Sequence, residues 1–283
     1  MIANAAERHI PFAATLVGRR ELSPDTALFR VAPEPAALEQ LSGFLPGQFV
    51  QLSVPGGGEV PISPADLPGE DGTLELCVRR VGQVTGLLHQ AAAGQPLALR
   101  GPFGTGFPVR EMTGHPALLL AGGLGIAPLR SLLLHLLRHR DQYGEITLMY
   151  GAREPGLMLF RDELVGLAAA HGLRLYLTVD FAREQAAGAY ACAIGLLPDL
   201  LKGFRFDAGE SYVAVCGPPP LYRCLVGELT GAGVAPERVL LSLERRMRCG
   251  IGRCCHCAIG TKLCCTDGPV FRLSEVADIP EAL

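Results

Sequence analysis

The feature that most constrains this chain is a cluster of cysteines near its C-terminal end. Six of the ten cysteines lie within residues 249–265. Four of them, Cys249, Cys254, Cys257 and Cys265, have the spacing Cys-x4-Cys-x2-Cys-x7-Cys. This is the spacing of plant-type [2Fe-2S] sites, in which four thiolates converge on two irons. The chain is therefore expected to fold so that one glycine-rich loop and a returning strand bring these thiols together.

A structural zinc site is the main alternative, because zinc also takes four thiolates and His256 adds an imidazole. Zinc ligands usually come as two close pairs with a longer spacer, whereas here a glycine-rich loop spreads three cysteines before the return. A disulfide framework is disfavoured if the chain is cytosolic. The spacing favours the iron–sulfur interpretation and leaves zinc open.

Length and charge narrow the function further. A chain of 283 residues predicts two domains. Its 25 basic and 28 acidic residues are scattered, and it has no Trp, so no nucleic-acid-binding surface is indicated. The N-terminus lacks a secretory signal, and the most apolar stretch, 116–137, is interrupted by glycines, Pro128 and Arg130. We therefore expect a cytoplasmic protein without membrane insertion, whose thiols serve metal or redox chemistry.

The first third alternates short apolar runs with Gly and Pro turn signals, which predicts a small β-barrel. The expected strands cover 12–17, 26–31, 49–54, 74–81 and 97–99, and one short helix is expected near 85–93.

Three segments of this barrel carry polar features. In 58–64, prolines fix the backbone around the Ser63 hydroxyl. In 76–85, a strand runs into Gly82, with Thr85 as the expected N-cap of the helix. A free Gly82 N–H beside Arg79 and Arg80 would suit a pyrophosphate, although a capped helix with surface arginines explains the same residues. The third segment, 100–106, is a turn that is equally well explained as a plain loop.

After Gly114 the pattern changes to strand, glycine turn and helix, which predicts an α/β doubly wound unit with a parallel sheet. The expected strands are 116–121, 146–150, 173–179, 212–215 and 239–243, and the expected helices are 129–137, 159–170, 196–201 and 221–229.

The glycines of the first strand–helix turn, Gly122, Gly123 and Gly125, lie where such sheets bind pyrophosphates, but they do not form Gly-x-Gly-x-x-Gly. A tight structural turn explains them equally well. Two further strand ends, 150–153 and 215–220, are also rich in small residues. Three such turns along one edge of the sheet together predict a dinucleotide site.

With these motifs in this order, the chain resembles the ferredoxin–NADP reductase superfamily: a flavin barrel, a nicotinamide domain and an iron–sulfur tail. Segments 58–63 and 242–247, the cysteine spacing and Asp267-Gly268-Pro269-Val270-Phe271 resemble the gamma (diaphorase) subunits of cytoplasmic NAD(P)-linked [NiFe] hydrogenases. The B subunit of anaerobic sulfite reductase is similar, and the electron-transfer subunit of dihydroorotate dehydrogenase is more distant.

The resemblance implies an FAD-binding β-barrel over 1–112, an NAD(P)-binding α/β domain over 113–241 and a [2Fe-2S] segment over 242–283. The implied FAD residues are Pro61, Ile62, Ser63, Cys77, Val78, Arg79, Gly82, Val84 and Thr85. The implied NAD(P) residues are Gly122, Gly123, Gly125, Ile126, Ala127, Pro128, Gly151, Arg153, Cys216, Gly217 and Pro218. The implied cluster ligands are Cys249, Cys254, Cys257 and Cys265.

Two departures from the family pattern stand out. The usual Arg-x-Tyr-Ser flavin motif reads Val60-Pro61-Ile62-Ser63, so its arginine and its aromatic residue are both missing, and Arg79 or Arg80 is the hypothetical replacement for the charge. The cysteines Cys254 and Cys265 each have a cysteine neighbour, Cys255 and Cys264, so a swap of ligands stays open.

These features predict an NAD(P)H-linked flavin and iron–sulfur oxidoreductase subunit that passes electrons to a partner subunit. Hydride passes between the nicotinamide and FAD, and single electrons pass through the cluster. Cys216 and Glu244, at ends of late strands, are the candidates to line the flavin–nicotinamide stack. Arg153 follows a strand and would bind a 2′-phosphate or pair with Glu154 or Asp162. A zinc-stabilised or redox-sensing binding protein is the alternative of another class.

Overall fold

The computed structural model describes residues 10–182 and 192–283, which form two compact units. The first unit contains the described residues up to Phe107, residues 130–132 and residues 243–270. The second contains the other described residues, including the C-terminal 271–283. The cysteine loop thus belongs to the same unit as the N-terminal strands, while the domain boundaries expected at 112 and 241 stay predictions.

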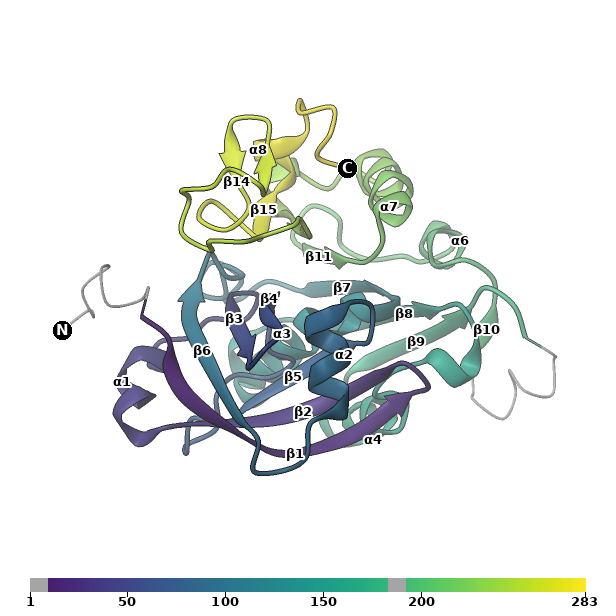
Figure 1. Cartoon of the computed structure of the whole chain (residues 1–283). Helices are drawn as coiled ribbons and strands as arrows, with labels where there is room; N and C mark the ends of the chain where they lie inside the picture. Colours follow the sequence, from purple (N-terminus) through teal and green to yellow (C-terminus); the bar gives the residue numbers. More distant parts are fainter. Residues whose placement is uncertain (1–9, 183–191) are drawn as a thin grey trace. The chain divides into compact units, whose positions relative to one another are not determined.

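The first unit is built on a six-stranded antiparallel sheet in the order β4-β3-β6-β1-β2-β5. Its purple and blue strands curl into a barrel-like form in Figure 1. The elements are β1 (Phe12–Ser23), β2 (Thr26–Pro33), α1 (Leu38–Leu41), β3 (Phe49–Val54), β4 (Gly58–Ile62), β5 (Leu74–Arg79), α2 (Gln83–Gln90) and β6 (Pro96–Phe103).

Alternation along these strands decides which side chains fill the core. In β3, Val50, Leu52 and Val54 are buried in the hydrophobic core with residues such as Phe29 and Leu99. The side chain of Gln51 points to the opposite face, yet it is also fully buried. The outer face of β3 is therefore covered by another part of the chain.

One strand of this unit was not predicted, and two local expectations are wrong. Residues 58–62 form a strand, β4, which tolerates Pro61 because it lies at the sheet edge. Residues 100–103 belong to β6 rather than to a turn or loop. The N-cap of α2 is Gly82, not Thr85, because Thr85 lies at the third helical position and its hydroxyl reaches back to the N-cap backbone.

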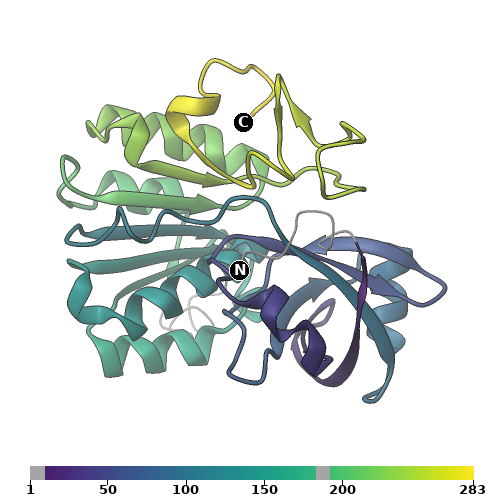
Figure 2. The same cartoon turned by 90° about the vertical axis from the view of Figure 1, so that its left-hand side faces the viewer.

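The second unit is an α/β unit with a seven-stranded sheet in the order β10-β9-β8-β7-β11-β12-β15. The teal and green ribbons of Figure 2 show its strands and helices. The elements are β7 (Ala117–Gly122), α3 (Ile126–Arg138), β8 (Ile146–Ala152), α4 (Arg161–His171), β9 (Arg174–Val179), β10 (Ala193–Ile194), α6 (Leu197–Lys202), β11 (Tyr212–Cys216), α7 (Pro219–Gly231), β12 (Val239–Ser242), β15 (Val270–Arg272) and α8 (Leu273–Val276).

The strands from β10 to β12 pair in parallel, as the alternating pattern predicts. From β7 the chain adds β8 and β9 on one side, and it then returns to add β11 and β12 on the other. This is the doubly wound arrangement, with its topological switch point at the carboxyl ends of β7 and β11. The predicted fold class is confirmed.

The turn after β7 packs closely against the turn after β11. A Cβ atom on Gly125 would lie 2.2 Å from the carbonyl oxygen of Cys216, and one on Gly217 would lie 3.2 Å from the Cα of Gly122. Backbone packing therefore requires glycine at position 125, while Gly217 is tightly packed against Gly122 and the Leu221 side chain. Gly123 differs, because its φ of +54° favours glycine while the space beside its Cα is open.

We expect Gly125→Ala to destabilise the second unit by about 1–3 kcal/mol, because the added methyl group overlaps backbone atoms that cannot rotate away. The matched control is Gly227→Ala in the middle of α7, where a methyl group meets nothing within 4 Å. That control is expected to be neutral or to stabilise by about 0.5–1 kcal/mol. Thermal unfolding of both variants tests this, and a Gly125→Ala variant as stable as the parent contradicts it.

Candidate functional site

The start of α2 supplies the backbone donors of the predicted flavin site. The Oγ1 atom of Thr85 accepts the N–H groups of Val81 and Gly82, both at 3.0 Å. The expectation of a free Gly82 N–H is therefore wrong. The first-turn N–H groups of Gln83 and Val84 have no partner four residues earlier in the helix, so they are the groups that can face a phosphate.

Arginines lie just before this helix start. Arg79 ends β5, Arg80 follows it, and both side chains are exposed. The charge of the Arg79 guanidinium also acts on the carboxyl group of Glu244, a residue with an exposed surface. Desolvation by the surrounding protein raises the pKa of this carboxyl, and Arg79 lowers it. Arg79 is thus a cation that lies in the predicted flavin-binding segment 76–85 and acts on Glu244.

The other predicted flavin residues differ in exposure. Cys77 and Val78 are buried in β5, and burial raises the pKa of the Cys77 thiol to about 12, so it stays protonated. Pro61, Ile62 and Ser63 are half-buried. Their contact with a flavin stays a prediction.

The predicted nucleotide residues converge on the switch point. Gly122, Gly123 and Gly125 follow β7, and Cys216, Gly217 and Pro218 follow the adjacent strand β11. Ile126, Ala127 and Pro128 form the first turn of α3. Gly151, on β8, is paired with Gly122, at the end of β7. The described residues thus place three predicted turns at neighbouring strand ends.

The turn after β11 is fixed by the carbonyl oxygen of Ser242. It accepts hydrogen bonds from the Tyr222 hydroxyl and, at 3.6 Å, from the Cys216 thiol. The Tyr222 oxygen also accepts the Gly217 N–H at 3.2 Å. Cys216 is therefore a buried, hydrogen-bonded residue of a rigid turn, and its proposed place beside a nicotinamide stays a prediction.

Arg153 follows β8 and is exposed. Its guanidinium lies 5.6 Å from the ring centre of Phe181, and its charge acts on Asp180, whose pKa is raised by burial. Asp162 pairs instead with Arg161. The guanidinium therefore lies at the strand end where a ribose is expected.

The cysteine loop holds its four predicted ligands as two pairs. The side chain of Cys249 helps to lower the pKa of Cys254, and the side chain of Cys257 helps to raise the pKa of Cys265. Positive φ angles at Gly250, Gly252 and Cys255 coil the loop. A short hairpin of β13 (Ala258–Ile259) and β14 (Lys262–Leu263) brings the chain back.

Backbone N–H groups point at sulfur in this loop. The N–H of Ile251 lies 3.4 Å from the Sγ of Cys249, and that of Gly252 lies 3.2 Å from the Sγ of Cys265. Hydrogen bonds from the backbone of His256 and Cys249 lower the pKa of the Cys254 thiol to about 7. The loop therefore favours anionic sulfur at Cys254.

The neighbouring cysteines are placed differently. Cys255 is exposed, whereas Cys264 is fully buried and donates its thiol hydrogen to the Leu243 carbonyl at 3.2 Å. Burial raises the pKa of both Cys264 and Cys265 to about 12, so pKa does not separate them. Their hydrogen bonds do, because Cys264 acts as a donor and Cys265 as an acceptor.

Over residues 10–182 and 192–283, no three His, Cys, Asp or Glu side chains stand together as a ready metal site. The donor set nevertheless fits a [2Fe-2S] cluster, in which each of two irons takes two protein ligands. The loop offers two thiol pairs and N–H donors to sulfur, and the imidazole of His256 faces the Cys254 carbonyl instead.

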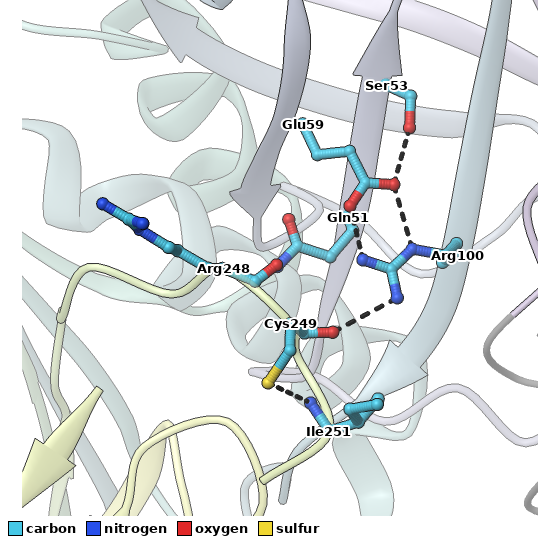
Figure 3. Close-up of polar contacts among 7 residues, drawn as sticks. All are labelled: Gln51, Ser53, Glu59, Arg100, Arg248, Cys249 and Ile251. Atoms are coloured by element: carbon cyan, nitrogen blue, oxygen red, sulfur yellow. Dashed lines mark hydrogen bonds and ion pairs between the residues drawn. The ribbon is translucent and has the colours of Figure 1, made fainter. Parts of the chain in front are cut away.

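The cysteine loop also contacts a polar face of the barrel that the sequence did not reveal. Arg100 donates to the Cys249 carbonyl at 3.2 Å, and Gln51 donates to the Arg248 carbonyl at 3.4 Å. Figure 3 shows both bonds, together with the ion pair of Arg100 and Glu59. Arg100 is separated from Cys249 by 149 residues, so no local signal could have indicated this contact.

Three family models match successive parts of the chain. An oxidoreductase FAD-binding domain matches residues 13–107, and an oxidoreductase NAD-binding domain matches 119–226. The iron–sulfur cluster binding domain of dihydroorotate dehydrogenase B matches 244–277.

Curated relatives match nearly the whole chain. The gamma subunit of sulfhydrogenase 2 from Pyrococcus furiosus is 39% identical over 271 residues, which cover 91% of this chain and 93% of that protein. The chain belongs to the ferredoxin–NADP reductase-like family of flavin-linked electron-transfer subunits. A probable electron-transfer subunit of dihydroorotate dehydrogenase B from Thermococcus kodakarensis is 34% identical, with 81% of this chain and 85% of that protein covered.

Solved structures agree on the fold. A chain of an NADH-dependent reduced ferredoxin–NADP oxidoreductase, described for flavin-based electron bifurcation, superposes with a TM-score of 0.75 at 25% identity. The match covers 95% of this chain and 90% of that one. The ferredoxin–NADP+ reductase of Neisseria gonorrhoeae with bound FAD and NADP gives a TM-score of 0.66 at 20% identity, covering 79% and 92% of the two chains.

The family membership confirms the expected cofactors and class: the chain is an oxidoreductase with FAD-binding, NAD-binding and iron–sulfur-binding domains. Among the described helices, none combines the length and the apolar character needed to cross a bilayer. The individual cofactor-binding residues remain predictions.

We expect the two cysteine doublets to respond asymmetrically to substitution. Cys255→Ala and Cys264→Ala should retain iron, although Cys264→Ala loses a buried hydrogen bond worth about 1 kcal/mol. Cys254→Ala and Cys265→Ala should lose the cluster. Iron content and the visible absorption of anaerobically purified protein measure this, and cluster loss in Cys264→Ala with retention in Cys265→Ala would reverse the assignment.

We expect Arg79→Ala to lower FAD retention, because this variant removes an exposed cation at the end of β5 in a chain that lacks the family arginine at Val60. Arg30→Ala, which removes an exposed charge elsewhere in the first unit, is the matched control, and Arg80→Ala tests the other candidate. FAD content after gel filtration is the measurement. Unchanged retention in Arg79→Ala would exclude Arg79 as the replacement.

Proposed function

We propose that this chain is the diaphorase subunit of a hydrogenase and that it transfers electrons between NAD(P)H and the hydrogenase subunits. The observation that carries the proposal is the extent of the match to sulfhydrogenase gamma subunits, which are 39% identical and have nearly the same length as this chain. Two dihydroorotate dehydrogenase relatives are 34% and 35% identical to this chain, and their matches cover 81% and 83% of it.

Bound FAD would exchange two electrons with a nicotinamide and single electrons with the iron–sulfur cluster. The chain's residues then have binding and orienting roles. The first turn of α2 and Arg79 would neutralise the flavin pyrophosphate. Gly123, at the switch point, leaves space for a nucleotide phosphate to approach the backbone.

The cysteines Cys249, Cys254, Cys257 and Cys265 would hold the cluster as two thiolate pairs, with the N–H groups of Ile251 and Gly252 directed at sulfur. Hydrogen bonds to sulfur stabilise added negative charge and so influence the potential. Cys216 and Glu244 are proposed neighbours of the nicotinamide–flavin stack. We also propose a cytoplasmic location, because the cysteine spacing is that of a metal site rather than of a disulfide framework.

A second candidate function is the same module in a dihydroorotate dehydrogenase. The match of residues 244–277 to the iron–sulfur domain of that enzyme favours it. Service to an anaerobic sulfite reductase is a related possibility, and a zinc-stabilised or redox-sensing binding protein is the alternative of another class.

We expect anaerobically purified protein to show flavin bands with sulfide-to-iron charge transfer, and to oxidise NADH or NADPH with a viologen dye. A colourless zinc protein without turnover would contradict the electron-transfer role. The partner is tested by expressing the tagged chain in its native host and identifying the proteins that co-purify with it. Hydrogenase subunits support the proposal, whereas dihydroorotate dehydrogenase would replace it with the second candidate.

A further inference from the structure

A pair of buried polar side chains on the barrel's outer face holds the first part of the cysteine loop. Gln51 on β3 and Arg100 on β6 are paired in register, so they lie side by side on one face. Gln51 is fully buried, and Arg100 is only 9% exposed. Their hydrogen bonds go to two successive main-chain carbonyls, those of Arg248 and Cys249.

Arg100 is the stronger of the two anchors. Its bond to the Cys249 carbonyl is 3.2 Å long, whereas the Gln51 bond is 3.4 Å long and the Gln51 Oε1 atom is buried without a partner among the described residues. Because the peptide unit is planar, fixing the Cys249 carbonyl also fixes the direction of the Gly250 N–H on its other side.

Glu59 on β4 fixes the guanidinium itself. Its two carboxylate oxygens accept hydrogen bonds from Nε and Nη2 of Arg100, a bidentate ion pair, and one oxygen also accepts the Ser53 hydroxyl at 2.9 Å. The hydrogen bond from Arg100 lowers the pKa of Glu59, so the carboxylate is ionised at neutral pH. Figure 3 shows Arg100 between Glu59 and the Cys249 carbonyl.

The loop fits tightly where it leaves this face. Gly250 has a φ of +74°, and a Cβ atom there would lie 3.3 Å from the Phe103 ring and 3.4 Å from the Gln51 Cγ. The same Phe103 ring lies 5.7 Å from the Arg100 guanidinium carbon. The guanidinium is therefore held from three sides, with one nitrogen directed at the residue that begins the cysteine motif.

We propose that Arg100, oriented by Glu59, is a positioning residue that fixes the Cys249 end of the loop and raises the reduction potential of the cluster. This inference rests on the proposed iron–sulfur function. Reduction adds negative charge, and a cation held near a ligand residue stabilises that charge in a poorly solvated site. Glu59 is directed away from Cys249, so the pair presents its positive end to the loop.

If Arg100 only anchored the loop, the expected change in the reduction potential would differ from that expected if its charge also acted on the cluster. Loss of either partner of a buried ion pair leaves the other charge uncompensated, and both losses weaken the structure. Their electrostatic effects on the cluster, however, are opposite in sign. The sign of the potential shift therefore separates the two roles.

The test is a redox titration of the whole holoprotein, in which the electron paramagnetic resonance signal of the reduced cluster is measured at each potential. Arg100→Gln is expected to shift the midpoint potential downward, and Glu59→Gln is expected to shift it upward. The double variant should lie between the two single variants. Arg30→Gln, which removes an exposed charge elsewhere in the first unit, is the matched control and should leave the potential unchanged.

Equal potentials in the parent and the variants, or shifts of the same sign in the two single variants, would overturn the proposal. If Arg100→Gln fails to fold, Glu59→Gln alone still decides, because an unchanged or lowered potential contradicts the proposal. A parent protein without a cluster signal would instead contradict the proposed function, so the two failures are distinguishable.

Discussion

The arrangement of the cysteine loop depends on hydrogen bonds from β3, from β6 and from Thr105, which lies just beyond β6. The loop has little regular structure of its own, since its hairpin has two residues in each strand. Arg100 in β6 holds the Cys249 carbonyl, and Thr105, two residues beyond that strand, holds the other end. The Thr105 N–H donates to the Gly268 carbonyl at 2.6 Å, and its hydroxyl contacts the carbonyls of Asp267 and Val270. Four thiols can converge because the two ends of the loop are fixed to β6 and to Thr105, just beyond it.

In the second unit, the corresponding constraint is the close packing of two turns. Gly125 contacts the Cys216 carbonyl so closely that no other residue fits. The Ser242 carbonyl accepts hydrogen bonds from both the Cys216 thiol and the Tyr222 hydroxyl. The strand order reverses between these turns, which is where open α/β sheets bind nucleotides. The structural and functional explanations of these glycines are therefore compatible: packing fixes Gly125 and Gly217, and Gly123 leaves the open space.

Much of the fold could be predicted from the sequence, because hydrophobic periodicity and glycine turns are local signals. The starts of α3 and α7 were predicted three and two residues too late, because prolines occupy their first turns: Pro128 in α3, and Pro219 and Pro220 in α7. Thr85 was misassigned because a threonine at the third helical position reaches the same backbone groups that an N-cap would. Cysteine spacing identified the candidate ligands, but Glu59, Arg100 and Cys249 meet only through tertiary packing, at separations of 41 and 149 residues.

The attachment of the two loop ends to Arg100 in β6 and to Thr105 just beyond it affects how the iron–sulfur segment can be inherited or engineered. The sequence from 243 to 270 looks like a terminal appendage, yet in space it belongs to the unit that contains the N-terminal strands. An excised C-terminal fragment would lack Arg100 and Thr105, whose hydrogen bonds fix Cys249 at one end of the loop and residues 267–270 at the other. Such a segment cannot be moved to another protein as an independent module, and its exchange between relatives requires that β6 be exchanged with it.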